Sequence, residues 1–130
     1  MGDRIHQYWM MKILVPVMLI AGICVIVSCD RGNVLEAELV DIDSLIYDDA
    51  DSAAVVLAKM KPQMKDASEA VRNYYNLLMV KVDDKTKHTH SSDSLICAVA
   101  EYYEQQEDRH LLPEAYYYVG RVNSCVHNGE

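Results

Sequence analysis

Residues 68–82 read SEAVRNYYNLLMVKV and carry the pattern that dominates this chain. Apolar side chains recur at three- and four-residue steps, which is the spacing of one face of an α-helix. Ser68 is suited to cap the first turn, and Glu69 follows it as a carboxylate in that turn, where negative charge favours a helix. The stretch therefore predicts a helix that begins near Ser68. Its expected buried face comprises Val71, Tyr74, Tyr75, Leu78 and Val82.

Four further segments show the same periodicity, two before this stretch and two after it. Helices are expected over about 34–47, from Asp51 or Ser52 to Pro62, from Ser92 or Asp93 to about 103, and from 112–113 onward. Pro62 ends the second helix because proline disfavours the helical conformation of the residue before it. No run alternates as a half-buried strand would. The chain is therefore expected to be all-α and built from antiparallel helix pairs.

Composition excludes several classes of protein. The chain has 12 basic and 20 acidic residues and a net charge of −8, which argues against a nucleic-acid-binding surface. Apolar residues make up 51%, so the chain is not disordered in composition, and four cysteines are too few for a disulfide scaffold. The sequence shows no phosphate-binding glycine loop and no Ser–His–Asp or Cys–His–Asn arrangement. We therefore expect no enzymatic activity and no cofactor.

The amino-terminal region has the sequence pattern of a targeting segment. Residues 13–27, ILVPVMLIAGICVIV, contain no charge and directly follow Lys12. A membrane-spanning helix needs about 20 apolar residues, whereas the core of a secretory signal needs about 7–15. We therefore predict a signal peptide over residues 1–28. Its true start is expected at Met10 or Met11, because these residues stand immediately before the basic residue and the apolar core.

Ile26, Val27, Ser28 and Cys29 end this core and resemble a bacterial lipobox. The resemblance implies that the Cys29 thiol receives a diacylglyceryl group, that the signal is cut before it, and that the new amino terminus is acylated, with palmitate as a typical chain. Two or three acyl chains anchor a protein stably where one does not. Residues 29–33 would then be the anchor and a short linker. The mature part would lie in the periplasm or at the cell surface, attached to the inner or outer membrane. The alternative is an uncleaved anchor helix.

Residues 114–122, EAYYYVGRV, resemble the first helix of a tetratricopeptide repeat. In that pattern a large aromatic residue is followed three residues later by an aliphatic one and then by a small one, here Tyr116, Val119 and Gly120. The small residue lets a neighbouring helix approach. The aromatic residue expected three positions after the glycine is replaced by Asn123, which departs from the pattern.

Weaker signals extend the resemblance over roughly Leu35–Glu130. Tyr74 and Leu77 fit first-helix positions of the repeat, and Ala98 and Tyr102 fit second-helix positions. The tetrapeptide DSLI at residues 43–46 also recurs at 93–96. The resemblance implies a tetratricopeptide-like (TPR-like) α-solenoid over residues 34–130, whose concave face holds a peptide or a partner helix.

This resemblance implies a lipid-anchored scaffold for protein–protein interaction at the bacterial envelope, with a protein or peptide partner, a membrane contact through its lipid, and no nucleic acid. The alternative is the sensor end of a TPR-containing membrane signalling regulator. The pattern stops where the second helix of a repeat should begin, so the solenoid is expected to be incomplete. The last helix would then leave an apolar face uncovered and open to self-association, with Val119, Val122 and Val126 as candidates.

The remaining polar and sulfur-bearing residues are expected to be structurally ordinary. His88 and His90 are two apart in a polar loop, which is poor spacing for a metal site, so no metal is expected. Cys97 and Cys125 could form a disulfide, but two buried free thiols are favoured. The acidic stretch over residues 30–51 is expected to be a solvated helix face near the anchor.

Overall fold

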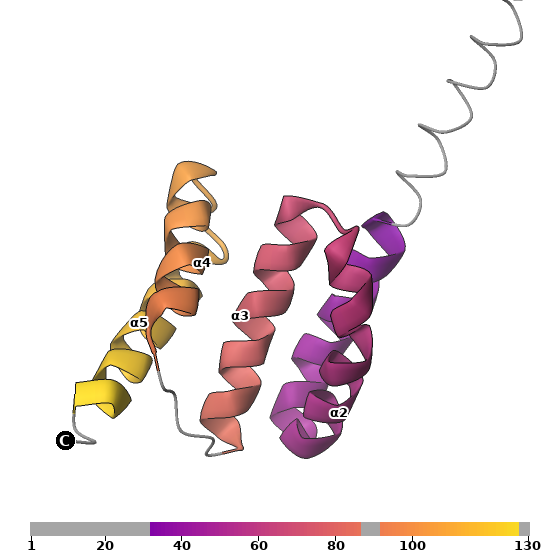
Figure 1. The fold of residues 1–130 in the computed structure, drawn as a ribbon, viewed down its shortest axis with the longest axis horizontal. Coiled ribbons are helices and arrows are strands. Elements are labelled where there is room, and N and C mark those ends of the chain that lie inside the picture. The colour runs from indigo at the N-terminus through magenta and orange to yellow at the C-terminus, as the bar shows by residue number, and fades with distance from the viewer. Residues whose placement is uncertain (1–31, 87–91, 128–130) are drawn as a thin grey trace, which may run out of the picture. The chain divides into compact units, whose positions relative to one another are not determined.

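The computed structural model of this chain describes residues 32–86 and 92–127. The predicted signal peptide, the stretch around Cys29 that resembles a lipobox, and the segment with His88 and His90 lie outside the described residues. The secondary structure of the described ranges is entirely helical (Figure 1). A helix covers residues 32–48, and it is followed by α2 (Ala50–Met60), the 3₁₀ turn η1 (Lys61–Lys65), α3 (Glu69–Lys85), α4 (Ser94–Gln105) and α5 (Leu112–His127). The predicted all-α class is confirmed.

From Leu35 onward, these helices belong to one compact unit, Leu35–Glu130. From α2 to α5, each helix runs opposite in direction to the one before it, and α3 lies between α2 and α4 (Figure 1). No helix in the described ranges combines the length and the apolar character needed to cross a membrane.

Local capping explains where the helices begin. The Ser68 hydroxyl caps α3 as predicted, accepting a hydrogen bond from the Val71 N–H at 3.3 Å. The predicted cap of α2 is wrong by two residues or more, because Asp49 takes this role: one carboxylate oxygen accepts from the Ser52 N–H at 3.0 Å and the other from the Ser52 hydroxyl at 2.6 Å. These hydrogen bonds hold the pKa of Asp49 below its ordinary value. The preceding helix continues to residue 48, so a single residue separates it from α2.

Two apolar clusters share α3 but have no buried residue in common. The first packs one side of α3 against the helix over 32–48, α2 and η1; its buried members are Leu39, Ile42, Ile46, Ala53, Leu57, Met60, Met64, Val71, Tyr75, Leu78 and Val82. The second packs the other side of α3 against α4 and α5; its buried members are Leu77, Val80, Ile96, Val99, Ala100, Tyr103, Ala115, Tyr118 and Val122. A helix with apolar residues on two sides must be covered by neighbouring helices on both sides, as α3 is here.

The carboxy-terminal helix packs differently from the prediction. Val122 is buried in the second cluster and Val119 packs partly against it, so neither forms an uncovered face, and the side chain of Val126 lies outside the described residues. The exposed large side chains of α5 are instead Tyr116, at 49% exposure, and Tyr117, at 59%. Gly120 is exposed, and a Cβ atom added there would meet nothing within 4 Å. No helix of the described chain therefore makes the close approach that the repeat pattern assigns to this glycine.

The structure corrects two other expectations, one about the burial of the cysteines and one about the repeated tetrapeptide. Cys97 and Cys125 are free thiols, as favoured, but both are exposed rather than buried. The repeated DSLI tetrapeptide does not mark equivalent structural positions, because Asp43 lies inside the helix over 32–48 whereas Asp93 is the residue that precedes α4.

Candidate functional site

A pocket of about 400 Å³ lies between the helix over 32–48, α3, α4 and the loop that joins α4 to α5. Three tyrosines line it, Tyr74 from α3 and Tyr102 and Tyr103 from α4. Glu36 and Asp108 bring carboxylates to the lining, which contains no lysine or arginine. Aliphatic side chains from three of these elements complete the wall. The pocket is therefore aromatic and apolar in its body and acidic in its charge.

The three tyrosines are held in different ways. The Tyr74 hydroxyl donates a hydrogen bond to Asp43 Oδ2 at 3.2 Å, and burial together with this carboxylate raises the pKa of Tyr74. The rings of Tyr102 and Tyr103 meet edge to face, with centroids 5.3 Å apart, a favourable arrangement for aromatic pairs. Tyr103 is only 3% exposed, and its buried hydroxyl has no hydrogen-bond partner within the described residues. Burial, and then the charge of Asp108, raise the pKa of Tyr103.

The start of α5 fixes the position of Asp108. The side-chain Oδ1 of Asp108 accepts hydrogen bonds from the backbone N–H groups of His110 at 2.8 Å and Leu111 at 3.0 Å. The backbone carbonyl of Asp108 accepts a hydrogen bond from the Leu112 N–H at 3.1 Å. The loop reaches this geometry through Glu107, which has a left-handed φ of 54°. Asp108 therefore caps the turn that begins α5 and also forms part of the pocket wall.

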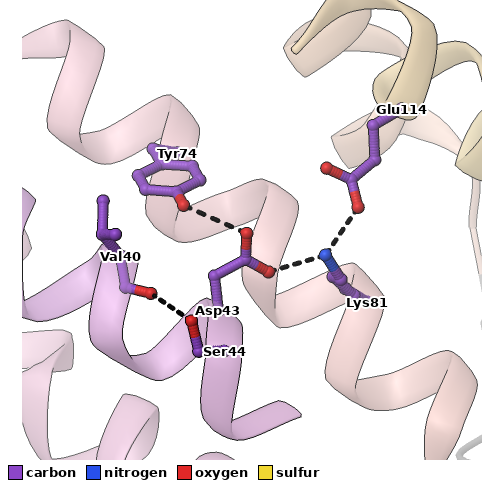
Figure 2. A network of polar contacts seen from close by, with 6 residues as sticks. All are labelled: Val40, Asp43, Ser44, Tyr74, Lys81 and Glu114. Carbon is purple, nitrogen blue, oxygen red and sulfur yellow. Dashed lines mark hydrogen bonds and ion pairs between the residues drawn. The ribbon is translucent and has the colours of Figure 1, made fainter. Parts of the chain in front are cut away.

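A buried lysine joins three helices beside the pocket (Figure 2). Lys81 of α3 is 1% exposed, and its Nζ lies 2.6 Å from Asp43 Oδ1 of the helix over 32–48 and 2.6 Å from Glu114 Oε1 of α5. Nζ also lies 4.6 Å from the centre of the Tyr47 ring. Burial alone would lower the pKa of Lys81, but the hydrogen bonds with Asp43 and Glu114 outweigh it and raise the pKa. Lys81 is therefore a permanent cation and not a proton donor or nucleophile at neutral pH.

This network also fixes one wall of the pocket. Asp43 accepts from Lys81 with one oxygen and from Tyr74 with the other, so the hydroxyl of a pocket tyrosine is tied to the ion pair (Figure 2). A second ion pair joins α3 to α5 nearby, where Arg121 donates to Asp84 Oδ1 at 2.8 Å and 3.1 Å. Charged hydrogen bonds of this kind are stronger than neutral ones. The orientation of α3 against its neighbours is therefore set by polar contacts as well as by apolar packing.

The structure brings together only some of the residues that the repeat pattern singled out. Tyr74 and Tyr102 line the pocket, and Leu77 is fully buried in the second cluster. Ala98, like Tyr116 and Gly120, is exposed. The pocket therefore uses the aromatic positions of α3 and α4 but not the motif on α5.

Lys81 and Asp43 were not anticipated from the sequence. The acidic stretch was expected to be a solvated face, and this is wrong for Asp43, whose side chain is 25% exposed and doubly hydrogen-bonded. The signal for Lys81 was available, since it stands alone in the apolar run LLMVKV over residues 77–82. A lysine inside such a run is almost never buried unless it is paired. Among the described residues, no group of three or more histidine, cysteine or acidic side chains is arranged to hold a metal ion.

Comparison of the chain with protein-family models, with curated proteins and with solved structures finds no match. The function of the chain is therefore inferred from its own residues and their geometry.

Proposed function

We propose that this chain is a lipid-anchored helical-repeat protein of the bacterial envelope that binds a protein or peptide partner. The observation that carries the binding role is the pocket of about 400 Å³ with its three tyrosines. Pockets between packed helices that combine apolar walls with a few polar groups are common ligand sites. Tyrosine is also enriched among the residues that dominate the energy of protein interfaces.

The stacking of the helices supports a TPR-like solenoid. Contacts join α2 to α3, α3 to α4 and α4 to α5, and α3 also meets α5. In repeat proteins each unit buries its apolar surface only against its neighbours, which is how α3 is covered on both sides here. Helices joined in this manner present an extended surface to a partner.

The anchor rests on the sequence around Cys29, and it yields a first prediction. Expressed in a Gram-negative host, the chain should lose residues 1–28 and gain a mass equal to a diacylglyceryl group plus an amide-linked acyl chain at Cys29, because the thiol follows a signal core directly. Cys29→Ala should leave the chain unprocessed and unlipidated. The measurement is mass spectrometry of the intact chain extracted from membranes.

Cys24 provides the matched control, because it lies within the signal core. Cys24→Ala should be processed and lipidated like the unchanged chain. An unmodified chain that still carries residues upstream of Cys29 would refute the anchor and leave the binding role untouched.

A second prediction tests the binding role. A photo-cross-linking amino acid placed at Gln106, an exposed residue of the pocket lining, should give one discrete adduct in living cells. The same amino acid placed at Gln63, an exposed residue of η1 outside the pocket lining, is the matched control and should give none. Denaturing electrophoresis followed by mass spectrometry detects the adduct.

The comparison between the two positions decides the result. A discrete adduct from position 106 alone supports a partner at the pocket. Adducts of equal yield from both positions, or from neither, would contradict the binding role.

A further inference from the structure

The charge of the pocket indicates which class of ligand can bind there. Glu36 and Asp108 supply the carboxylates of its lining, which also contains the imidazole of His110. The chain as a whole is also acidic, with a net charge of −8. Charges of one sign in a partly enclosed site raise the local concentration of ligands of the opposite sign. The carboxylates would therefore repel an anionic ligand and attract a cationic one.

The aromatic lining suits a cation for a second reason. The faces of tyrosine rings attract ammonium and guanidinium groups through their quadrupole, and three such rings line the pocket. Lys81 above Tyr47 shows the same contact inside the protein, at 4.6 Å. The aliphatic stem of a lysine or arginine would pack against the apolar side chains of the wall.

We propose that the pocket receives the cationic side chain, arginine or lysine, of a partner peptide whose neighbouring residues are apolar. This inference rests on the proposed binding function and specifies its ligand. The carboxylates of Glu36 and Asp108 neutralise the charge, and the tyrosine rings contact the stem and the head group. The pocket volume of about 400 Å³ falls within the range of ligand sites, which is about 300–1,000 Å³.

The test uses the full chain in detergent micelles and three matched peptides, acetyl-Leu-Arg-Leu-amide, acetyl-Leu-Gln-Leu-amide and acetyl-Leu-Glu-Leu-amide. Isothermal titration calorimetry measures their dissociation constants. The arginine peptide should bind about tenfold more tightly than the glutamine peptide, because two carboxylates and the tyrosine rings of the lining attract its charge. The glutamate peptide should bind most weakly. High salt should reduce the preference for arginine, because salt screens the carboxylates.

Two variants locate the binding at the pocket. Glu36→Gln should weaken the arginine peptide about two- to fivefold, as expected for an exposed charge pair, and should leave the glutamine peptide unchanged. Tyr102→Leu removes a half-buried aromatic ring of the lining and should weaken the arginine peptide about two- to fivefold, as expected for the loss of one cation–π contact.

Tyr117→Leu is the matched control for the tyrosine variant. Tyr117 is 59% exposed on α5 and is not part of the pocket lining. This variant should leave the affinity for the arginine peptide unchanged.

The outcomes separate this inference from the proposed function. Equal affinity for the arginine and glutamine peptides, or no binding of either, would overturn the cation site, while a discrete cross-link from position 106 would still support a partner at the pocket. Spermidine that binds as tightly as the arginine peptide would also overturn the inference, since the site would then hold a small cation. Preference for arginine that Glu36→Gln and Tyr102→Leu both reduce would confirm it.

Discussion

Lys81→Ala is expected to lower the free energy of unfolding by about 3 kcal/mol or more. The alanine removes the one cation that Asp43 and Glu114 share and leaves two partly buried carboxylates facing each other, with side chains 25% and 28% exposed. It also releases Asp43 from one of the two contacts that position Tyr74. Urea unfolding of the full chain in detergent, followed by far-UV circular dichroism, measures the change.

The neighbouring lysine on α3 is the control. Lys85 is exposed and lies 4.9 Å from the centre of the Tyr47 ring, so Lys85→Ala should change the stability by about 0.5 kcal/mol or less. The triple variant Lys81→Met, Asp43→Asn, Glu114→Gln should recover most of the loss, because it removes the whole ion pair and not one partner. Equal stability of the Lys81→Ala and Lys85→Ala chains would contradict the buried network.

The pH dependence of this contribution has a definite sign. The carboxylate partners raise the pKa of Lys81 above the ordinary lysine value of 10.5, so the charged form is favoured by folding. The stability that Lys81 supplies through its charge is therefore fully present below pH 10.5 and is lost as the pH rises through the raised pKa. The Lys81→Ala chain should lack this alkaline transition.

Leu77→Ala and Leu78→Ala should each lower the free energy of unfolding by about 2–5 kcal/mol, because each truncates a fully buried leucine. The two variants should nevertheless destabilise different parts of the molecule. Leu77 belongs to the second cluster, so its loss should speed amide hydrogen exchange mainly in α4 and α5. Leu78 belongs to the first cluster, so its loss should act mainly on α2 and the helix over 32–48. Hydrogen-exchange mass spectrometry resolves the two patterns.

Val55→Ala is the control for both leucine variants. Val55 is 55% exposed on α2, and its truncation should change the stability by about 0.5 kcal/mol or less. Identical exchange patterns for Leu77→Ala and Leu78→Ala would contradict the division of the core into two clusters.

Features set by neighbouring residues were predictable from the sequence. The three- and four-residue spacing located every α-helix of the described ranges but not the 3₁₀ turn η1, and Ser68 was identified as a cap because its side chain acts on the turn that follows it. The cap of α2 was missed for a local reason as well. A helix that runs to residue 48 leaves only Asp49 as the boundary, and spacing of apolar residues does not fix a boundary that closely.

Features set by contacts distant in sequence were not predictable. Leu77 and Leu78 are adjacent, and a single apolar stripe cannot reveal that both are buried, since this depends on helices that cover α3 from two sides. Asp43 and Lys81 are 38 residues apart, and only the packing of their helices joins them. The pocket is likewise a product of tertiary packing, because its lining comes from four separate segments. The sequence singled out Tyr74 and Tyr102 as repeat positions, but it did not indicate that they line one cavity.

The two clusters meet at the pocket, and this has a consequence for cooperativity. Val71 of the first cluster and Tyr103 of the second both line it. The two clusters share no buried residue, so in an empty chain their openings are coupled only through α3 and the Lys81 contacts with Asp43 and Glu114. A ligand that touches both walls is lost as soon as either cluster opens, so its binding energy opposes both openings. An occupied chain should therefore unfold more cooperatively than an empty one.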